Sequence, residues 1–100
     1  MKKYKVTLLA GARQDIREAK KWYNRRQKGL GKRLTSDMTN TLQSISANPK
    51  AFAIRYKDFR LANFDIFPYA AHFYIDESSQ AAYITAILHT SMHPDIGRNR

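Results

Sequence analysis

Two stretches of helical periodicity joined by a very short loop constrain the fold of this chain more than any other feature. In both stretches apolar residues recur every three or four positions: Ala12, Ile16, Ala19 and Tyr23 in the first, and Leu34, Met38, Leu42 and Ile45 in the second. The connecting residues 28–31 contain two glycines and leave room only for a tight turn. We therefore predict an antiparallel helical hairpin whose apolar faces pack on a sheet.

Charged residues and helix breakers indicate where the two helices end. Asp15 and Glu18 lie near the start of the first helix, which suits the helix dipole. Basic residues crowd its end: Lys20, Lys21, Arg25, Arg26 and Lys28. Gly29 is the expected stop. The second helix is expected to begin after Gly31 and to end near Asn48, because a proline disfavours helical geometry in the residue before it.

Segments with β propensity flank the hairpin on both sides. Residues 4–9 alternate between apolar and polar side chains, and three further runs cover residues 59–64, 70–76 and 81–89. The expected fold class is α+β in the order βααβββ, with a twisted, mainly antiparallel sheet that the hairpin covers on one face. Residues 1–100 are expected to form a single domain, with little structure in the tail from Pro94 to Arg100.

The composition narrows the class of partner. Lys and Arg number 18 against 8 Asp and Glu, so the formal net charge is +10 and nucleic acid or an acidic protein is the expected partner. There is no cysteine, and His72, His89 and His93 lack the spacing of zinc ligands, so we expect no metal and no other cofactor. The apolar run near the N-terminus is too short for a signal peptide or a membrane span, which favours a cytoplasmic protein with no membrane partner.

Side chains alternate along a strand, and this predicts which residues share the face that the helices leave open. In the last strand the fully apolar alternate positions suit the core: Ile84, Ala86 and Leu88. The positions between them then face away from the helices: Tyr83, Thr85, Ile87 and His89.

Side chains are expected to alternate in the same way along the two preceding strands. Arg60 is expected to face outward and Leu61 inward, while His72 and Tyr74 face outward from the middle strand. Arg60, His72, Tyr74 and His89 would then share one open face. Taken singly, each position has an ordinary alternative, because a strand tyrosine usually packs and a strand arginine is usually solvated.

Together, these residue types can hold and cut an RNA backbone. Arginine presents forked donors that match phosphate, and histidine exchanges a proton near neutral pH. The candidate catalytic residues are therefore Arg60 and His89, with His72 as a reserve proton carrier. The candidate RNA-binding residues are Arg55, Lys57, Tyr74 and Arg98.

Short motifs in a fixed order along the chain resemble those of the RelE/ParE toxin superfamily. They are Ala12-x-x-Asp15-Ile16-x-x-Ala19-x-x-Trp22-Tyr23, Gly29-Leu30-Gly31, Asn48-Pro49, Phe67-Pro68-Tyr69, and Ala86-Ile87-Leu88-His89 followed by Pro94 and Arg100. On a βααβββ frame the resemblance spans nearly the whole chain. We interpret Trp22 and Tyr23 as core residues, because aromatic side chains at helical spacing usually pack.

The resemblance implies a toxin of a type II toxin–antitoxin system, or a plasmid stabilisation protein, which arrests bacterial growth until a cognate antitoxin binds it. RelE-like members cleave mRNA on the ribosome, whereas ParE-like members poison DNA gyrase. By position, Arg60 corresponds to a phosphate-contacting arginine of RelE-like toxins, and His89 to the residue that often closes the last strand. Met92 and Gly97 occupy positions where the superfamily often has an arginine and a tryptophan. The missing arginine weakens the case that this chain has a complete set of nuclease residues.

The function that the sequence favours is a ribosome-dependent endoribonuclease acting on mRNA, because of Arg60 and the histidines. The alternative is a ParE-like, non-catalytic inhibitor of DNA gyrase. The third is a chain that has lost toxicity and remains the partner of its antitoxin. All three share that partner, which we expect to contribute an acidic or amphipathic segment.

Overall fold

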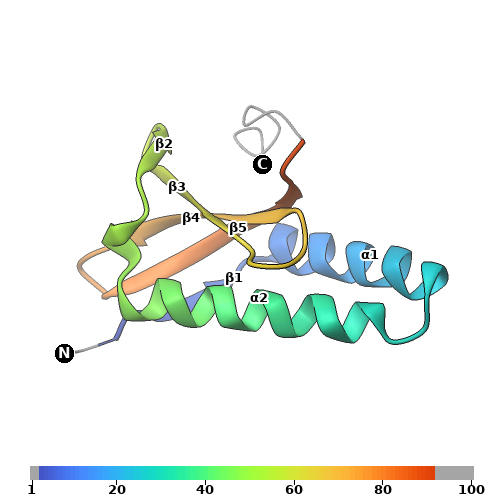
Figure 1. Ribbon diagram of the computed structural model, residues 1–100. Helices are drawn as coiled ribbons and strands as arrows, with labels where there is room; N and C mark the ends of the chain where they lie inside the picture. Colours follow the sequence, from blue (N-terminus) through green and yellow to red (C-terminus); the bar gives the residue numbers. More distant parts are fainter. Residues whose placement is uncertain (1–2, 92–100) are drawn as a thin grey trace.

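The elements follow the predicted order, with one addition. The computed structural model describes residues 3–91. Along the chain it contains β1 (Lys5–Leu8), α1 (Ala10–Arg26), α2 (Leu30–Ala47), a 3₁₀ turn η1 (Pro49–Ala51), β2 (Ile54–Tyr56), β3 (Phe59–Asn63), β4 (Tyr69–Asp76) and β5 (Ala81–His89). Both helices lie on one side of the sheet (Figure 1). The α+β class is confirmed; strand β2 was missed because three residues are too few to show an alternating pattern.

The strands form one sheet in the spatial order β1-β5-β4-β3-β2. Strand β1 runs parallel to β5, and all other neighbours are antiparallel, which confirms the mainly antiparallel sheet. A parallel neighbour requires a long crossover, and here the helical hairpin lies within the chain between these two strands. The long strands β4 and β5 therefore lie inside the sheet, while β2 forms one edge.

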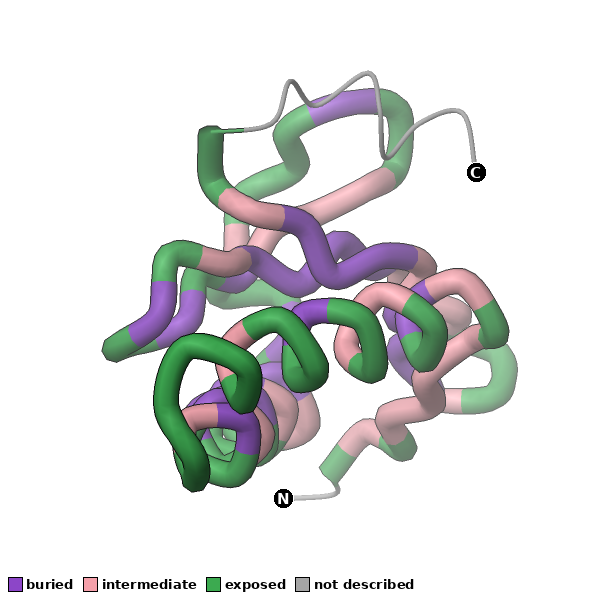
Figure 2. The backbone as a smooth tube through the Cα atoms, turned by 90° about the vertical axis from the view of Figure 1, so that its right-hand side faces the viewer, coloured by how far each residue is buried: buried purple, intermediate pink, exposed green. Residues whose placement is uncertain are grey.

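The hydrophobic core lies between the hairpin and the sheet. The helices contribute Ala12, Ala19, Leu34, Met38 and Ile45, and the sheet contributes Ala62, Ala71, Phe73, Ala82, Ile84 and Ile87. Figure 2 shows the buried segments on the strands and on the helix faces turned toward them. The helical periodicity in the sequence thus identified the buried helix faces correctly.

Two glycines shape the turn between the helices, but the second helix begins earlier than predicted. Gly29 has a φ of 95°, in the left-handed region that favours glycine, and α2 starts at Leu30. Gly31 therefore lies inside the first turn of α2, where its amide donates to Oδ1 of Asn24 at 2.9 Å. A Cβ on Gly31 would come within 2.7 Å of the Asn24 and Lys20 side chains. The small residue allows α1 and α2 to approach closely.

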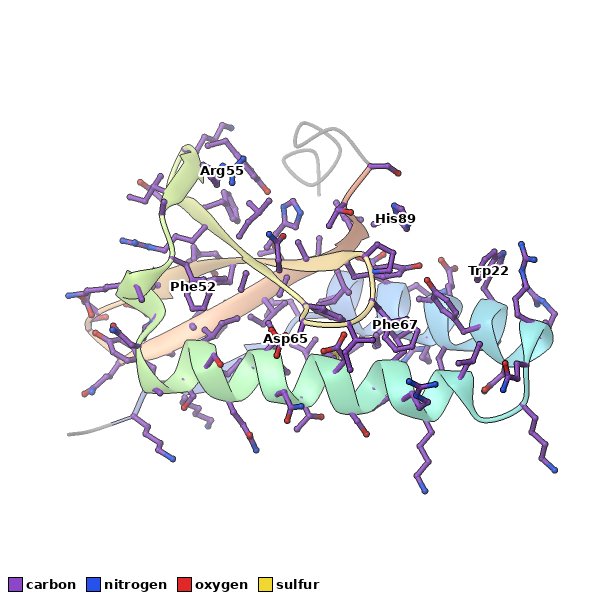
Figure 3. All side chains as sticks on the ribbon, viewed as in Figure 1. Trp22, Phe52, Arg55, Asp65, Phe67 and His89 are labelled. Atoms are coloured by element: carbon purple, nitrogen blue, oxygen red, sulfur yellow. The ribbon has the colours of Figure 1, made fainter. Side chains whose placement is uncertain are left out.

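A buried carboxylate on α2 holds the loop between β3 and β4, a feature that the sequence analysis did not predict. Asp37 is only 1% exposed. Its oxygens accept hydrogen bonds from the backbone amides of Asp65 at 3.2 Å, Ile66 at 2.9 Å and Phe67 at 2.8 Å. Figure 3 shows Asp65 and Phe67 on this loop, beside α2. The carboxylate thus replaces the strand partners that these amides lack.

A β-bulge in β5 interrupts the regular alternation of side chains. Phe73 of β4 pairs with Ile84, but the preceding residue His72 pairs with Ala86. Thr85 is therefore an extra residue on β5. From this point on, every side chain of β5 lies on the face opposite to the one that simple alternation predicts.

The predicted faces at the end of β5 were wrong for this reason. Ile87, expected on the open face, belongs to the core cluster. Ala86 instead shares the open face with its partner His72. His89 pairs with Tyr69, whose ring packs against the core, so His89 lies toward the helix side at the end of the strand.

The prediction for β3 was also wrong, by a shift of one residue. Arg60 pairs with the core residue Phe73, and Leu61 pairs with His72. Paired residues of neighbouring strands share a face, so Leu61 lies on the open face and Arg60 on the helix side. The expected cluster of Arg60, His72, Tyr74 and His89 on one face is therefore not formed.

Glu77, in the turn after β4, links three separate parts of the chain. Its carboxylate accepts a hydrogen bond from the Tyr4 hydroxyl at 2.7 Å and forms an ion pair with Lys50. The hydrogen bond from Lys50, followed by that from Tyr4, lowers the pKa of Glu77. A lowered pKa in the folded state stabilises the fold above the ordinary pKa of a glutamate, and this stabilisation is lost as the pH falls through the lowered value.

We therefore expect Glu77→Gln to lower the melting temperature at pH 7, and we expect the difference from the wild type to shrink as the pH falls through the lowered pKa of Glu77, where the wild-type carboxylate becomes protonated. Melting curves of both proteins across this pH range measure the difference. Glu18→Gln is the matched control, since the Glu18 carboxylate accepts its hydrogen bond from Gln14 within the same helix. A melting difference for Glu77→Gln that persists at the lowest pH would contradict this account.

Candidate functional site

A row of aromatic rings crosses the open face of the sheet. Tyr56 stacks on Phe59 with ring centres 5.1 Å apart, Phe59 meets Tyr74 edge-on at 5.8 Å, and Tyr74 lies 5.4 Å from Tyr83. The rings come from strands β2, β3, β4 and β5 in spatial order. Tyr74 is on the open face as predicted, but its ring packs within this row. The row was not predicted from the sequence, because Tyr56 belongs to the unpredicted strand β2 and the face of Phe59 depends on the register of β3.

His72 lies beside Tyr56, at the β2 end of this row, and is almost completely buried. It is 4% exposed, and its Nδ1 is 2.8 Å from the hydroxyl of Tyr56. The position on the open face agrees with the sequence prediction. An imidazole enclosed in this way is poorly placed to exchange a proton with a substrate, which requires direct contact or a single bridging water.

Arg60 uses its guanidinium to hold the segment that precedes β2. Its Nη1 donates to the carbonyl oxygen of Phe52 at 2.7 Å and to that of Lys50 at 3.4 Å. Arg60 pairs with Phe73 and His89 with Tyr69, four residues apart along β4. At a rise of about 3.3 Å per residue, this offset of four residues places Arg60 and His89 about 13 Å apart along the strand direction.

His89 lies at the far end of β5 and is partly exposed (Figure 3). Its Nδ1 accepts a hydrogen bond from the amide of Ser91 at 3.2 Å and is 2.8 Å from the Ser91 hydroxyl. Because Nδ1 acts as an acceptor, the proton of the neutral ring belongs on Nε2. The ring also meets Tyr69 edge-on, with ring centres 5.4 Å apart.

Two hollows meet at His89. The first, which we call the open-face hollow, brings three predicted site residues together; it is lined by Arg55, Leu61, Asn63, Ala70, His72, Leu88, His89 and Thr90. The exposed Arg55 overhangs this face from β2 (Figure 3). Two further predicted residues, Lys57 and Tyr74, line a different hollow with Arg60. Arg98 lies outside the described residues.

The second hollow, the helix-side hollow, lies between α1 and the end of the sheet. It is lined by Asp15, Glu18, Ala19, Trp22, Tyr23, Tyr69, Ile87, Leu88 and His89. Asp15 is fixed there, since its carboxylate accepts a hydrogen bond from the amide of Ile87 at 3.0 Å. Trp22 is 44% exposed, so its prediction as a core residue was wrong, whereas Tyr23 packs against Phe67 with ring centres 5.0 Å apart.

The side chains that line the open-face hollow and the helix-side hollow are of types that bind a partner. Aromatic rings, an exposed arginine and two carboxylates line the hollows, and within residues 3–91 no three side chains of metal-ligating type are grouped closely enough to hold an ion. Neither helix of the described chain is long and apolar enough to cross a membrane.

Comparison with solved structures shows which proteins share this fold. The toxin–antitoxin system ParDE encoded on the P. aeruginosa chromosome contains a chain that superposes with a TM-score of 0.75 at 12% identity, covering 86% of this chain and 95% of that one. A chain of the RelBE2 toxin–antitoxin complex from Mycobacterium tuberculosis superposes with a TM-score of 0.66 at 18% identity, covering 89% and 93%. The fold is that of the RelE/ParE toxin superfamily, as the sequence motifs indicated.

The sequence itself identifies the family. The family model described as the ParE toxin of the type II toxin–antitoxin system parDE matches residues 6–94. The chain therefore belongs to the ParE toxin family. A search of curated proteins gave no significant match.

Proposed function

We propose that this toxin arrests bacterial growth by inhibiting DNA gyrase without catalysing a reaction. The observation that carries the proposal is the separation of the groups that RNA cleavage would need. The Arg60 guanidinium is bound to the carbonyl oxygens of Phe52 and Lys50, whereas His89 lies at the other end of β4 and β5. Membership of the ParE family supports the same choice.

A nuclease requires a phosphate-binding cation beside groups that transfer protons. Among the described residues, the histidine nearest the centre of the open face is the covered His72. Because Arg60 is held by backbone carbonyl oxygens and His72 is buried, the case for RNA cleavage is weaker than the sequence indicated. A surface that binds a protein target needs no such arrangement.

We also propose a cognate antitoxin as the partner that neutralises this toxin in the cytoplasm. Both similar structures come from toxin–antitoxin systems by their titles. The net charge of +10 favours an acidic or amphipathic segment, as expected from the composition. Loss of growth arrest when the adjacent gene is co-expressed would test this partner directly.

The test of gyrase inhibition uses purified enzyme, relaxed plasmid and ATP, with and without the full-length chain. We expect the toxin to block supercoiling or to trap cleaved DNA, and to leave mRNA intact in a translating extract. Arg55→Gln and His89→Gln should inhibit gyrase as well as the wild type does. Unchanged supercoiling and an unchanged cleavage pattern at excess toxin would contradict the proposal.

Ribosome-dependent RNA cleavage is the second candidate, favoured by the open-face hollow. This hollow brings Arg55, His72 and His89 together, which are residue types able to bind phosphate and transfer protons. In that case message would be cut in the translating extract, and Arg55→Gln or His89→Gln would protect it. A chain that affects neither gyrase nor message, yet binds its antitoxin, would have lost toxicity.

A further inference from the structure

The tip of the helical hairpin carries a dense group of exposed cations. We call it the basic tip, and it consists of Lys20, Lys21, Arg25, Arg26, Lys28, Lys32 and Arg33, all exposed. The sequence has no Asp or Glu between residues 19 and 36. Seven of the 18 basic residues of the chain therefore lie in a short acid-free segment, and they account for much of the net positive charge.

These cations have no counter-charge within the described chain. The ion pair among residues 3–91 joins Lys50 to Glu77, at the opposite end of α2. None of the seven side chains donates a hydrogen bond to a described residue. Unpaired cations close together repel one another, so an external polyanion that neutralises them is attracted strongly.

The hairpin holds the cations together at one end of an elongated molecule. The principal dimensions are 41 × 30 × 21 Å, and the turn between α1 and α2 projects at the end opposite β1 (Figure 1). The close approach at Gly31 keeps the two helix ends adjacent, so cations from both helices lie around one tip, where Lys20 and Lys32 line a common hollow.

Trp22 connects this tip to the helix-side hollow. The guanidinium carbon of Arg26 lies 4.4 Å from the centre of the Trp22 ring, which forms a cation–π contact. Trp22 also lines the helix-side hollow. It is the one tryptophan in the sequence, so its fluorescence reports on this place alone.

We propose that the basic tip binds the phosphate backbone of duplex DNA. Lysine and arginine side chains contact the phosphates of a duplex, and this contact releases condensed counterions. Single-stranded nucleic acid is a poorer fit, because it needs several bare aromatic rings for base stacking, whereas this tip has a single tryptophan ring that already stacks with Arg26. A protein partner usually requires an apolar centre, which seven cations around one tryptophan do not provide.

The choice of DNA rather than duplex RNA rests on the proposed function, because gyrase works on DNA. In this arrangement the toxin binds DNA beside its enzyme target, and the tip strengthens that complex without taking part in chemistry. The binding test below contains no gyrase, so its failure is separate from a failure of gyrase inhibition.

The experiment titrates the purified full-length chain with a 20-base-pair DNA duplex, a length of about two turns, at about 50 mM salt. We expect a change in Trp22 emission and an affinity that falls steeply as salt is raised. For about four phosphates contacted, the slope of log K against log salt should be near −3.6.

Lys28→Glu combined with Arg33→Glu tests the site. Arg33 lies in the first turn of α2, where an acidic side chain suits the helix dipole, so we expect the fold to persist. The matched control is Lys3→Glu with Lys5→Glu, which changes the net charge equally at exposed positions away from the tip. The tip variant should bind at least about tenfold more weakly, and the control within about threefold of the wild type.

Each other outcome overturns the proposal. Equal weakening by both double variants would mean that overall charge, not the tip, binds DNA. Absence of binding, or binding without a change in Trp22 emission, would exclude the site. Tighter binding of a poly-glutamate peptide of the same charge than of the duplex would identify an acidic protein as the partner instead. If the Glu variant melts early, Lys28→Gln with Arg33→Gln should still weaken binding, and unchanged binding by it would also exclude the site.

Discussion

Asp37→Ala is expected to lower the free energy of unfolding by about 3–5 kcal/mol. The carboxylate is buried and accepts hydrogen bonds from the amides of Asp65, Ile66 and Phe67. Without it those donors lose their partner, and hydrogen bonds to a charged acceptor are among the stronger ones in proteins. Denaturant unfolding followed by circular dichroism measures the loss, which is a large share of the stability of a domain of this size.

Two further variants separate the role of the charge from that of the position. Asp37→Asn keeps one carbonyl acceptor but replaces the other oxygen with a donor, so it should lose a substantial part of the same stability. Asp58→Ala removes an exposed carboxylate from the turn between β2 and β3 and should cost less than about 1 kcal/mol. Equal small losses for Asp37→Ala and Asp58→Ala would show that the loop does not depend on the buried carboxylate.

Phe73→Ala is expected to lower the free energy of unfolding by about 3–5 kcal/mol. Phe73 is fully buried at the centre of β4, beside the bulge of β5. Its ring meets that of Phe52 edge-on, with ring centres 5.9 Å apart. The truncation opens a cavity in the core and releases the segment that leads into β2. Chemical denaturation with unchanged m-values would measure the loss.

Phe59→Ala is the matched control, because it deletes the same atoms from the opposite face. Phe59 is partly exposed and lies in the aromatic row of the open face, between Tyr56 and Tyr74. Its loss should cost about 1–2 kcal/mol. A larger loss for Phe59→Ala than for Phe73→Ala would mean that the helices cover the other face of the sheet.

Local features of the sequence predicted the structure correctly. The apolar spacing of Leu34, Met38 and Ile45 needs only helical geometry, and all three residues are buried. Pro49 ended the second helix near the predicted residue, since a proline restricts its immediate neighbour. The ordered motifs also indicated the superfamily that the comparisons then showed.

The candidate site could not be predicted as well, because a side chain's face depends on strand register. Because Thr85 is an extra residue in β5, Ile87 lies in the core and not on the predicted open face. Because the register of β3 differs by one residue from the prediction, Arg60 lies on the helix side. A bulge involves hydrogen bonding between strands, so the sequence of one strand alone does not reveal it. His72 was predicted on the correct face, yet its hydrogen bond with Tyr56 depends on strand β2, which the sequence did not predict.

The helical hairpin that first constrained the fold was determined by the sequence alone, because helix periodicity, a short loop and a proline act within a few residues. The resemblance to the family and the basic residues at the end of the first helix were also evident there. Only the tertiary structure decided which side chains meet, because the positions of Arg60, His89 and the Asp37 carboxylate depend on pairing and packing between segments far apart in the chain.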